Sequence, residues 1–241
     1  MTGSAGVTRL HASALEIMRG WVAPDDDQDE LRRAYVRHLL DHDDGMLVTC
    51  LPAHLTASAL VLDAAGQRVL LTHHRKGGFW AQLGGHIEEA DRSLADAALR
   101  EGREESGVEG LRLLGEGPVD LDAHELSSAF GRCGTHLDVR YAAVAPPGAD
   151  PVVSAESHDV RWFAVDALPP GVVADIGRLV DRARGVLAQP GGSPASVRSV
   201  SSPSSLASSP ASTSPASTSS ASSSSASSRR PRSAVADTPS R

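Results

Sequence analysis

The last fifth of the chain is the feature that most limits what this sequence can fold into. From 190 to 241 about two residues in five are Ser, most of the others are Ala, Pro or Thr, and no aromatic residue occurs. Because such a segment has too little apolar surface to offset the entropy of ordering it, we expect a disordered tail. Roughly 190 residues remain for folding, which favours one domain with an extension over a two-domain enzyme.

The tail and the body of the chain differ in charge. The tail holds five of the 23 Lys and Arg residues against a single acid, Asp237, so the formal charge of −7 for the whole chain becomes −11 for the body. A nucleic-acid backbone would repel a body this acidic, so we expect no nucleic-acid polymer as a partner. The acids need another explanation, such as solubility or a bound cation.

Cysteine usage and hydropathy bear on the compartment. Cys50 and Cys133 are far apart and form neither a disulfide framework nor a zinc motif, which favours a reducing cytoplasm. The stretch Met1–Val22 lacks the pattern of a signal peptide, and no apolar run approaches the length of about 18 residues that a membrane span needs. We therefore expect a cytoplasmic protein with no membrane partner.

Apolar periodicity predicts helices packed on a mixed sheet, an α/β (α+β) sandwich. The expected helices span 10–21, 31–40, 94–106 and 171–187, and the expected strands span 55–62, 68–72, 111–114, 119–123, 136–145 and 159–163. Ser93 with Asp96 forms a capping-box signature, and Gly107 stands where a C-cap glycine belongs. Gly84-Gly85 is expected to form a loop. The predicted organisation is an N-terminal helical extension over 1–48, a domain over 49–189 and a disordered tail over 190–241.

Three carboxylates on the helix over 94–106 are unfavourably placed unless a cation binds. Glu101, Glu104 and Glu105 are spaced i, i+3 and i+4, so they share one face at about 5–6 Å between Cβ atoms. They also lie in the last turns of the helix, where the macrodipole disfavours negative charge. The alternative is a solvated acidic face paired with Arg100 and Arg103. Clustered hard oxygen ligands after a glycine pair favour Mg²⁺ or Mn²⁺, which hold substrate phosphates.

The stretch Gly85–Val108 resembles the Nudix box. That box runs Gly, five residues, Glu, seven residues, Arg-Glu, an aliphatic residue, any residue, Glu-Glu, any residue, Gly and an aliphatic residue. Its second half matches at Arg100, Glu101, Glu104, Glu105, Gly107 and Val108. In the first half Asp91 replaces Glu and eight residues separate it from Arg100, and Gly102 replaces the first aliphatic residue. Because the extra residue precedes the helix, the three carboxylates keep their register.

The resemblance implies a Nudix-like α/β/α sandwich and a metal-dependent hydrolase. It implies that Glu101, Glu104 and Glu105 bind Mg²⁺ or Mn²⁺, with the Gly85 carbonyl as a further candidate ligand. Arg100 in such proteins pairs with a box glutamate and fixes its rotamer, and Asp91 is assigned to the same supporting role.

Catalysis also needs a base that takes a proton from the attacking water. Glu105 and Glu104 are the candidates within the box, and Glu156 is the candidate from outside it, against the alternative of a surface-loop acid.

His86, Lys76 and Trp80 surround the glycine pair and are the candidates for contact with the substrate. The alternatives are an exposed loop lysine and a core tryptophan. His73, His74 and His86 suggest a histidine metal site, but we do not expect one, because no cysteine is near and no helical histidine spacing occurs.

The sequence thus predicts a hydrolase that cleaves a phosphoanhydride bond in a nucleoside diphosphate linked to another moiety. One alternative is a non-catalytic Nudix-like ligand-sensing domain, although such domains commonly lose box glutamates that are present here. A diphosphate isomerase on the same fold is a second alternative, but Cys50 and Cys133 lie outside the box. The two N-terminal helices could cover the pocket or form a homodimer contact, and both roles remain open.

Overall fold

The computed structural model of the protein describes residues 5–75, 77–126, 133–153 and 157–189. Lys76, Glu156 and the predicted disordered tail therefore lie outside the described residues. In chain order the elements are α1 (Ala5–Gly20), α2 (Asp26–Asp41), β1 (Ala53–Leu62), β2 (Arg68–His74), β3 (Trp80–Ala81), β4 (Leu83–His86), α3 (Leu94–Ser106), β5 (Arg112–Leu114), β6 (Asp120–Glu125), β7 (Thr135–Val144), β8 (Ser157–Ala164) and α4 (Ile176–Leu187).

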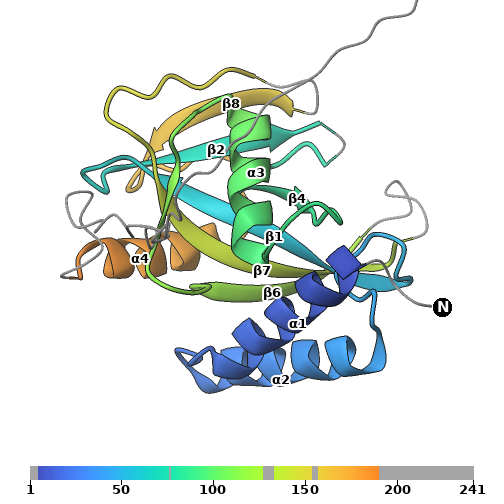
Figure 1. Ribbon diagram of the computed structural model, residues 1–241. Helices are drawn as coiled ribbons and strands as arrows, with labels where there is room; N and C mark the ends of the chain where they lie inside the picture. Colours follow the sequence, from blue (N-terminus) through green and yellow to red (C-terminus); the bar gives the residue numbers. More distant parts are fainter. Residues whose placement is uncertain (1–4, 76, 127–132, 154–156, 190–241) are drawn as a thin grey trace, which may run out of the picture. The chain divides into compact units, whose positions relative to one another are not determined.

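A mixed sheet lies at the centre of the described chain (Figure 1). Its main path is β3-β2-β1-β7-β5, while β4 pairs with β1, β6 with β7 and β8 with β2. Strands β1 and β7 run parallel from the pair Ala53 and Thr135 to the pair Leu62 and Val144, and the other strand pairs are antiparallel. The expected α/β architecture with a mixed sheet is confirmed.

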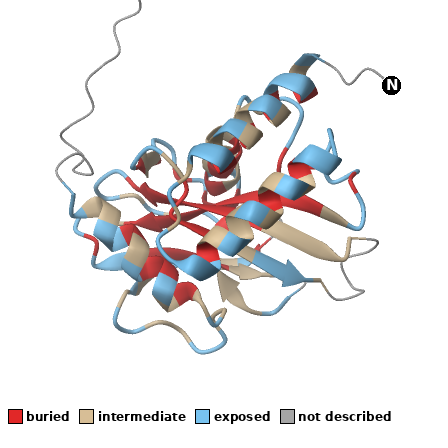
Figure 2. Cartoon of the chain, turned by 90° about the horizontal axis from the view of Figure 1, so that it is seen from below, coloured by how far each residue is buried: buried red, intermediate tan, exposed pale blue. Residues whose placement is uncertain are grey.

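The two faces of β1 pack against different helices because successive side chains alternate between the faces. Ala57 and Ala59 belong to a core cluster that includes buried residues of α1, α2 and α3. Leu60 and Leu62 belong to a second cluster with buried residues of α4. Figure 2 shows the buried residues along the strands and on the inward sides of the helices. Helices therefore cover both faces of the sheet, as the α/β/α prediction requires.

The two N-terminal helices are confirmed, with one correction. The expected helix over 31–40 rests on apolar residues at 31, 35, 39 and 40 as one face, but Leu39 is completely buried whereas Leu40 is 55% exposed. Leu40 lies about 140° around the helix from Tyr35, so it cannot share the buried face. None of the helices in the described ranges combines the length and the apolarity that crossing a bilayer would require.

The last helix begins later than the apolar pattern suggested. Gly171 has a φ of +75°, and α4 starts only at Ile176. The Trp80 N–H donates to the Gly171 carbonyl at 3.0 Å, and the Val173 N–H donates to the Trp80 carbonyl at 2.9 Å. The residues before Ile176 are therefore bonded to β3, which prevents them from continuing the helix.

Candidate functional site

Local capping positions α3, which carries the three predicted carboxylates. The Ser93 hydroxyl accepts the Asp96 N–H at 3.1 Å at the start of the helix. At its end Gly107 has a φ of +65° and donates its N–H to the Arg103 carbonyl at 2.7 Å. Both caps were predicted, and they fix the turns from which the glutamates project.

The glycine pair lies in β4 and not in a loop, so that prediction is wrong. Gly84 pairs with Ser58 and Gly85 with Ala57 of β1. A Cβ atom on Gly84 would lie 2.3 Å from the Ser58 Cβ, and one on Gly85 would lie 2.7 Å from Glu101 Oε2. The glycines therefore serve close approach: the first lets the strands pack, and the second leaves space for the Glu101 carboxylate.

The three glutamates of α3 differ in exposure. Glu105 is only 6% exposed, and its Oε2 accepts the Gly84 N–H at 3.0 Å. The Glu101 side chain is 12% exposed, whereas that of Glu104 is 59% exposed. The set thus runs from a buried carboxylate attached to β4 to one that reaches solvent.

Arg100 connects these glutamates to the loop before the helix. Its guanidinium donates to both carboxylate oxygens of Asp91 at 3.0 Å and to the His86 carbonyl at 2.8 Å. Its Nη1 donates to Glu101 and Glu104 at 2.9 Å each. The hydrogen bond that Arg100 donates to Asp91 raises the pKa of Arg100, so the guanidinium stays charged. Despite the extra residue in the box, Asp91 therefore lies within bidentate reach of Arg100.

The donor set fits a hard divalent cation. Three carboxylates and the carbonyls of β4 are the oxygen ligands that Mg²⁺ and Mn²⁺ prefer. Arg100 Nη1 lies between Glu101 and Glu104 and bonds to both, so this face already accepts positive charge. The carboxylates themselves do not converge on one point. Among the described residues, the group whose potential ligand atoms all lie within 4.8 Å of one another consists of three histidines.

A polar strip on the other face of the sheet was missed by the sequence analysis. Asp138 of β7 accepts hydrogen bonds from Thr56 at 3.1 Å and Ser58 at 2.7 Å, both on β1. It also accepts from Gln82 and from Arg140, each at 3.1 Å. The signal was present as alternation, because the polar residues recur at every second position of two expected strands.

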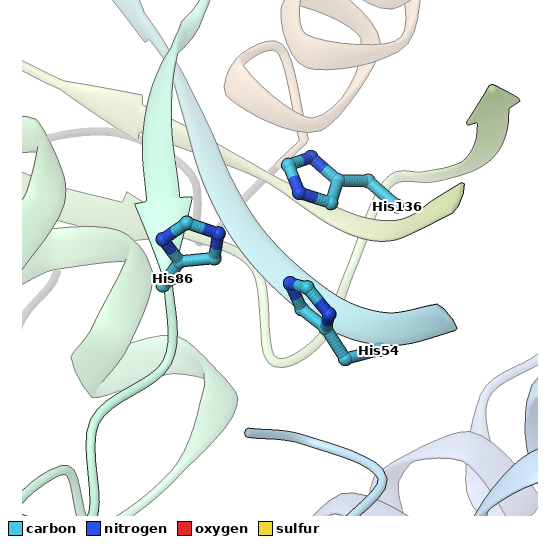
Figure 3. A group of neighbouring side chains, drawn as sticks. All are labelled: His54, His86 and His136. Carbon is cyan, nitrogen blue, oxygen red and sulfur yellow. The ribbon is translucent and has the colours of Figure 1, made fainter. Parts of the chain in front are cut away.

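Three histidines extend this strip toward the end of β4 (Figure 3). His54 lies directly opposite His136 in the parallel β1–β7 ladder, and His86 pairs with Thr56, two residues after His54. The ring centroids are 5.0 to 5.4 Å apart. Cys133 Sγ lies 3.4 Å from His54 Nδ1. A cysteine is thus near His54, which was not among the histidines considered for a metal site from the sequence.

Burial keeps two of these rings neutral. It lowers the pKa of His54 to about 4 and the pKa of His136 to about 3, and neighbouring imidazoles add to the effect. Each ring is therefore uncharged at neutral pH and keeps one nitrogen lone pair.

The other two histidines singled out from the sequence contact aromatic rings. His73 lies against Trp80, with ring centroids 5.0 Å apart, and His74 stacks on Phe79 at 5.5 Å. Trp80 is half-buried and meets Phe163 edge-on at 4.8 Å, and both pack against the core cluster under α4. Of the histidines singled out from the sequence, only His86 joins the group near β4.

Comparison with known proteins identifies the family. The sequence model of the NUDIX domain matches residues 52–183, which is more than half of the chain. The NAD-capped RNA hydrolase NudC of Pseudomonas aeruginosa is 32% identical over 119 residues, covering 48% of this chain and 38% of the relative. The match thus spans about two fifths of the length of the curated relative.

Solved structures give matches of the same kind. A NUDIX-family hydrolase from Clostridium perfringens has a TM-score of 0.45 and 22% identity, covering 56% of this chain and 95% of its own. The C. elegans Ap4A hydrolase has a TM-score of 0.45 and 20% identity, covering 56% and 97%. Because the matched family model covers more than half of the chain and includes α3, its glutamates and the strands that hold them, the chain belongs to the NUDIX domain family.

Proposed function

We propose that the protein uses Mg²⁺ or Mn²⁺ to hydrolyse a phosphoanhydride bond in a nucleoside diphosphate linked to another moiety. The observation that carries this proposal is the face of α3 beside β4. There Glu105 accepts the Gly84 N–H, and Glu101 and Glu104 share one guanidinium. Such carboxylates suit the cation that accompanies substrate phosphates.

Glu101, Glu104 and Glu105 are the proposed cation ligands, together with the Gly85 carbonyl. When bound, the cation neutralises negative charge on the diphosphate oxygens and makes a coordinated water more acidic. Arg100 restrains two of the ligands through hydrogen bonds and is itself anchored by Asp91. This anchoring fixes the carboxylates before substrate arrives.

The proton of the attacking water is proposed to go to Glu104. Its side chain is the most exposed of the three, so it can pass the proton to solvent, whereas Glu105 is buried and bonded to β4. Glu105 remains an alternative base within the box. Glu156 is the alternative from outside it and lies outside the described residues.

The substrate class is supported by chemistry and by one relative. NAD, which the name of the Pseudomonas relative contains, is a nucleoside diphosphate joined to another moiety. The acidic body disfavours an RNA chain, so a free small molecule is proposed here. Contacts from His86, Lys76 and Trp80 to this substrate remain part of the proposal, as do a cytoplasmic location and a homodimer.

The test is hydrolysis by the full chain with Mg²⁺ or Mn²⁺ across NAD, ADP-ribose, nucleotide sugars and dinucleoside polyphosphates, with products separated by chromatography. We expect at least one diphosphate to be cleaved, and Glu105→Gln to reduce kcat/KM by at least about 100-fold. Glu104→Gln and Glu156→Gln test the other two candidate bases.

Glu109→Gln is the matched control, because Glu109 is an exposed acid just beyond the box. This variant should cleave the substrate as fast as the unmodified chain. The proposal fails if no member of the panel is cleaved, if chelation leaves the rate unchanged, or if Glu105→Gln is fully active. Tight binding of a panel member without cleavage would favour the ligand-sensing alternative.

A further inference from the structure

Three strands bring imidazole rings together at one end of the polar strip. His54 and His136 are direct neighbours across the β1–β7 ladder, and His86 lies on the opposite side of β1, two positions along. All three side chains rise from the same sheet face, because pairing and alternation place them there. One ligand nitrogen from each lies within 4.8 Å of the others, and Figure 3 shows the rings turned toward a common space.

The chemistry of this group differs from that of the glutamates. His54 is completely buried, and one of its ring nitrogens donates to the Cys50 backbone, which leaves the other with a lone pair. A ring that donates to a backbone carbonyl from one nitrogen is oriented to bind a metal with the other. Neutral imidazoles packed together without such a ligand gain little from their proximity.

We propose that His54, His86 and His136 bind one transition-metal ion of the zinc class through one imidazole nitrogen each, at a site separate from the carboxylates of α3. Imidazole favours Zn²⁺, Co²⁺ or Ni²⁺, whereas the hard oxygens of α3 favour Mg²⁺ or Mn²⁺. The fourth position is open to water or to an oxygen of the substrate, as in zinc sites with three protein ligands.

Only small movements are needed to form the site. Zinc-bound nitrogens in a tetrahedron are about 3.3 Å apart, so ligand nitrogens that lie within 4.8 Å of one another need to approach by at most about 1.5 Å. His86 is exposed and His136 half-buried, so both side chains can rotate. Bound metal would tie β4 to β1 and β7 next to the His86 carbonyl, which Arg100 holds.

Two neighbours of the group are not assigned as ligands. Cys133 Sγ contacts His54 but is not among the three mutually close ligand residues. His124 of β6 lies opposite His136, with ring centroids 5.5 Å apart, but its Nδ1 lies 2.7 Å from Asp122 Oδ2. His124 is exposed, on the same sheet face and outside the group, so it provides a matched control.

The test is metal binding by the full chain, purified without a histidine tag and stripped with a chelator. Zn²⁺ is titrated by calorimetry in excess Mg²⁺, which saturates the carboxylates, and Co²⁺ is followed by its visible absorption. We expect one Zn²⁺ per chain and a Co²⁺ spectrum of nitrogen ligation. Removing a residue that only hydrogen-bonds to a zinc ligand costs about 10–100-fold in metal affinity. Removing a ligand itself should cost more, so His86→Ala and His136→Ala should weaken Zn²⁺ binding by at least about 100-fold.

His124→Ala should bind Zn²⁺ as the unmodified chain does, and Zn²⁺ should raise the melting temperature of both. His54→Ala tests the buried ligand, and circular dichroism checks its folding. If His54→Ala does not fold, His86→Ala still tests the proposal, because His86 is exposed. Absence of stoichiometric Zn²⁺ binding in excess Mg²⁺ would overturn the proposal. Unchanged affinity in His86→Ala and His136→Ala, or an equal loss in His124→Ala, would overturn it as well.

Discussion

Gly84 and Gly85 are neighbours in β4, but a side chain at each would meet a different part of the molecule. At Gly84 an added Cβ meets the backbone of β1, with the Ser58 Cα at 2.7 Å and the Ala57 carbonyl oxygen at 2.9 Å. At Gly85 the three nearest atoms all belong to the carboxylate of Glu101. A side chain at Gly84 would therefore disturb strand packing, whereas one at Gly85 would displace a carboxylate that is a proposed cation ligand.

Substituting each glycine with alanine should reveal this difference. Gly84→Ala should lower the free energy of unfolding by about 3 kcal/mol, because β1 and β4 must move apart. Gly85→Ala should change it by less than about 1 kcal/mol but displace the Glu101 carboxylate, which reduces kcat/KM on the order of 100-fold. Urea denaturation and the hydrolysis assay measure the two effects, and each variant is the control for the other. Equal loss of stability in both variants would contradict this assignment.

The residues of the candidate site differ in how far the sequence could predict them. Glu101, Glu104 and Glu105 share a face by local helical geometry alone, so their proximity could be read from spacing. The group of His54 with His136 could not, because it depends on a β1–β7 register set by residues far apart in the chain.

Among the elements, α3 was predicted most closely because its signals are local. Its bounds agree with the expected helix over 94–106, and both caps lie within one residue of its ends. The start of α4 was predicted too early because the residues before it bond to Trp80 of β3. Helical periodicity is a local pattern, so it cannot indicate a hydrogen-bond partner as distant in the sequence as Trp80.

Substitution with alanine should change the free energy of unfolding in opposite directions at the glycine that ends α3 and at a glycine inside α4. Gly107 has a φ of +65°, and an added Cβ would lie 3.0 Å from the Val152 Cβ, so Gly107→Ala should cost roughly 1–2 kcal/mol. Gly185 lies within α4 and has open space around it, so Gly185→Ala should stabilise by about 0.5–1 kcal/mol. Thermal unfolding of both variants measures whether each change stabilises or destabilises the protein. Stabilisation by Gly107→Ala would contradict the left-handed conformation of Gly107.

In the folded chain as a whole, the N-terminal helices are part of the core. The NUDIX match begins at residue 52, yet Leu10, Met18 and Tyr35 share one core cluster with β1, β7 and α3. The Tyr35 hydroxyl donates to the Asp122 carbonyl at 2.7 Å, and the Gln28 amide exchanges two hydrogen bonds with the Leu121 backbone. Sequence periodicity predicted these helices, but it could not show which surface they cover.

Two adjacent leucines of α2 test whether the family domain depends on this packing. Leu39 is completely buried in the shared cluster, whereas Leu40 is 55% exposed. Leu39→Ala should therefore lower the free energy of unfolding by about 2–5 kcal/mol, in one transition that also removes hydrolase activity. Leu40→Ala should change it by no more than about 0.5 kcal/mol. If α1 and α2 were an independent extension, Leu39→Ala would unfold them alone and leave activity unchanged. Denaturation followed in parallel by circular dichroism and by activity distinguishes the two cases, because only a shared core makes both signals fall together.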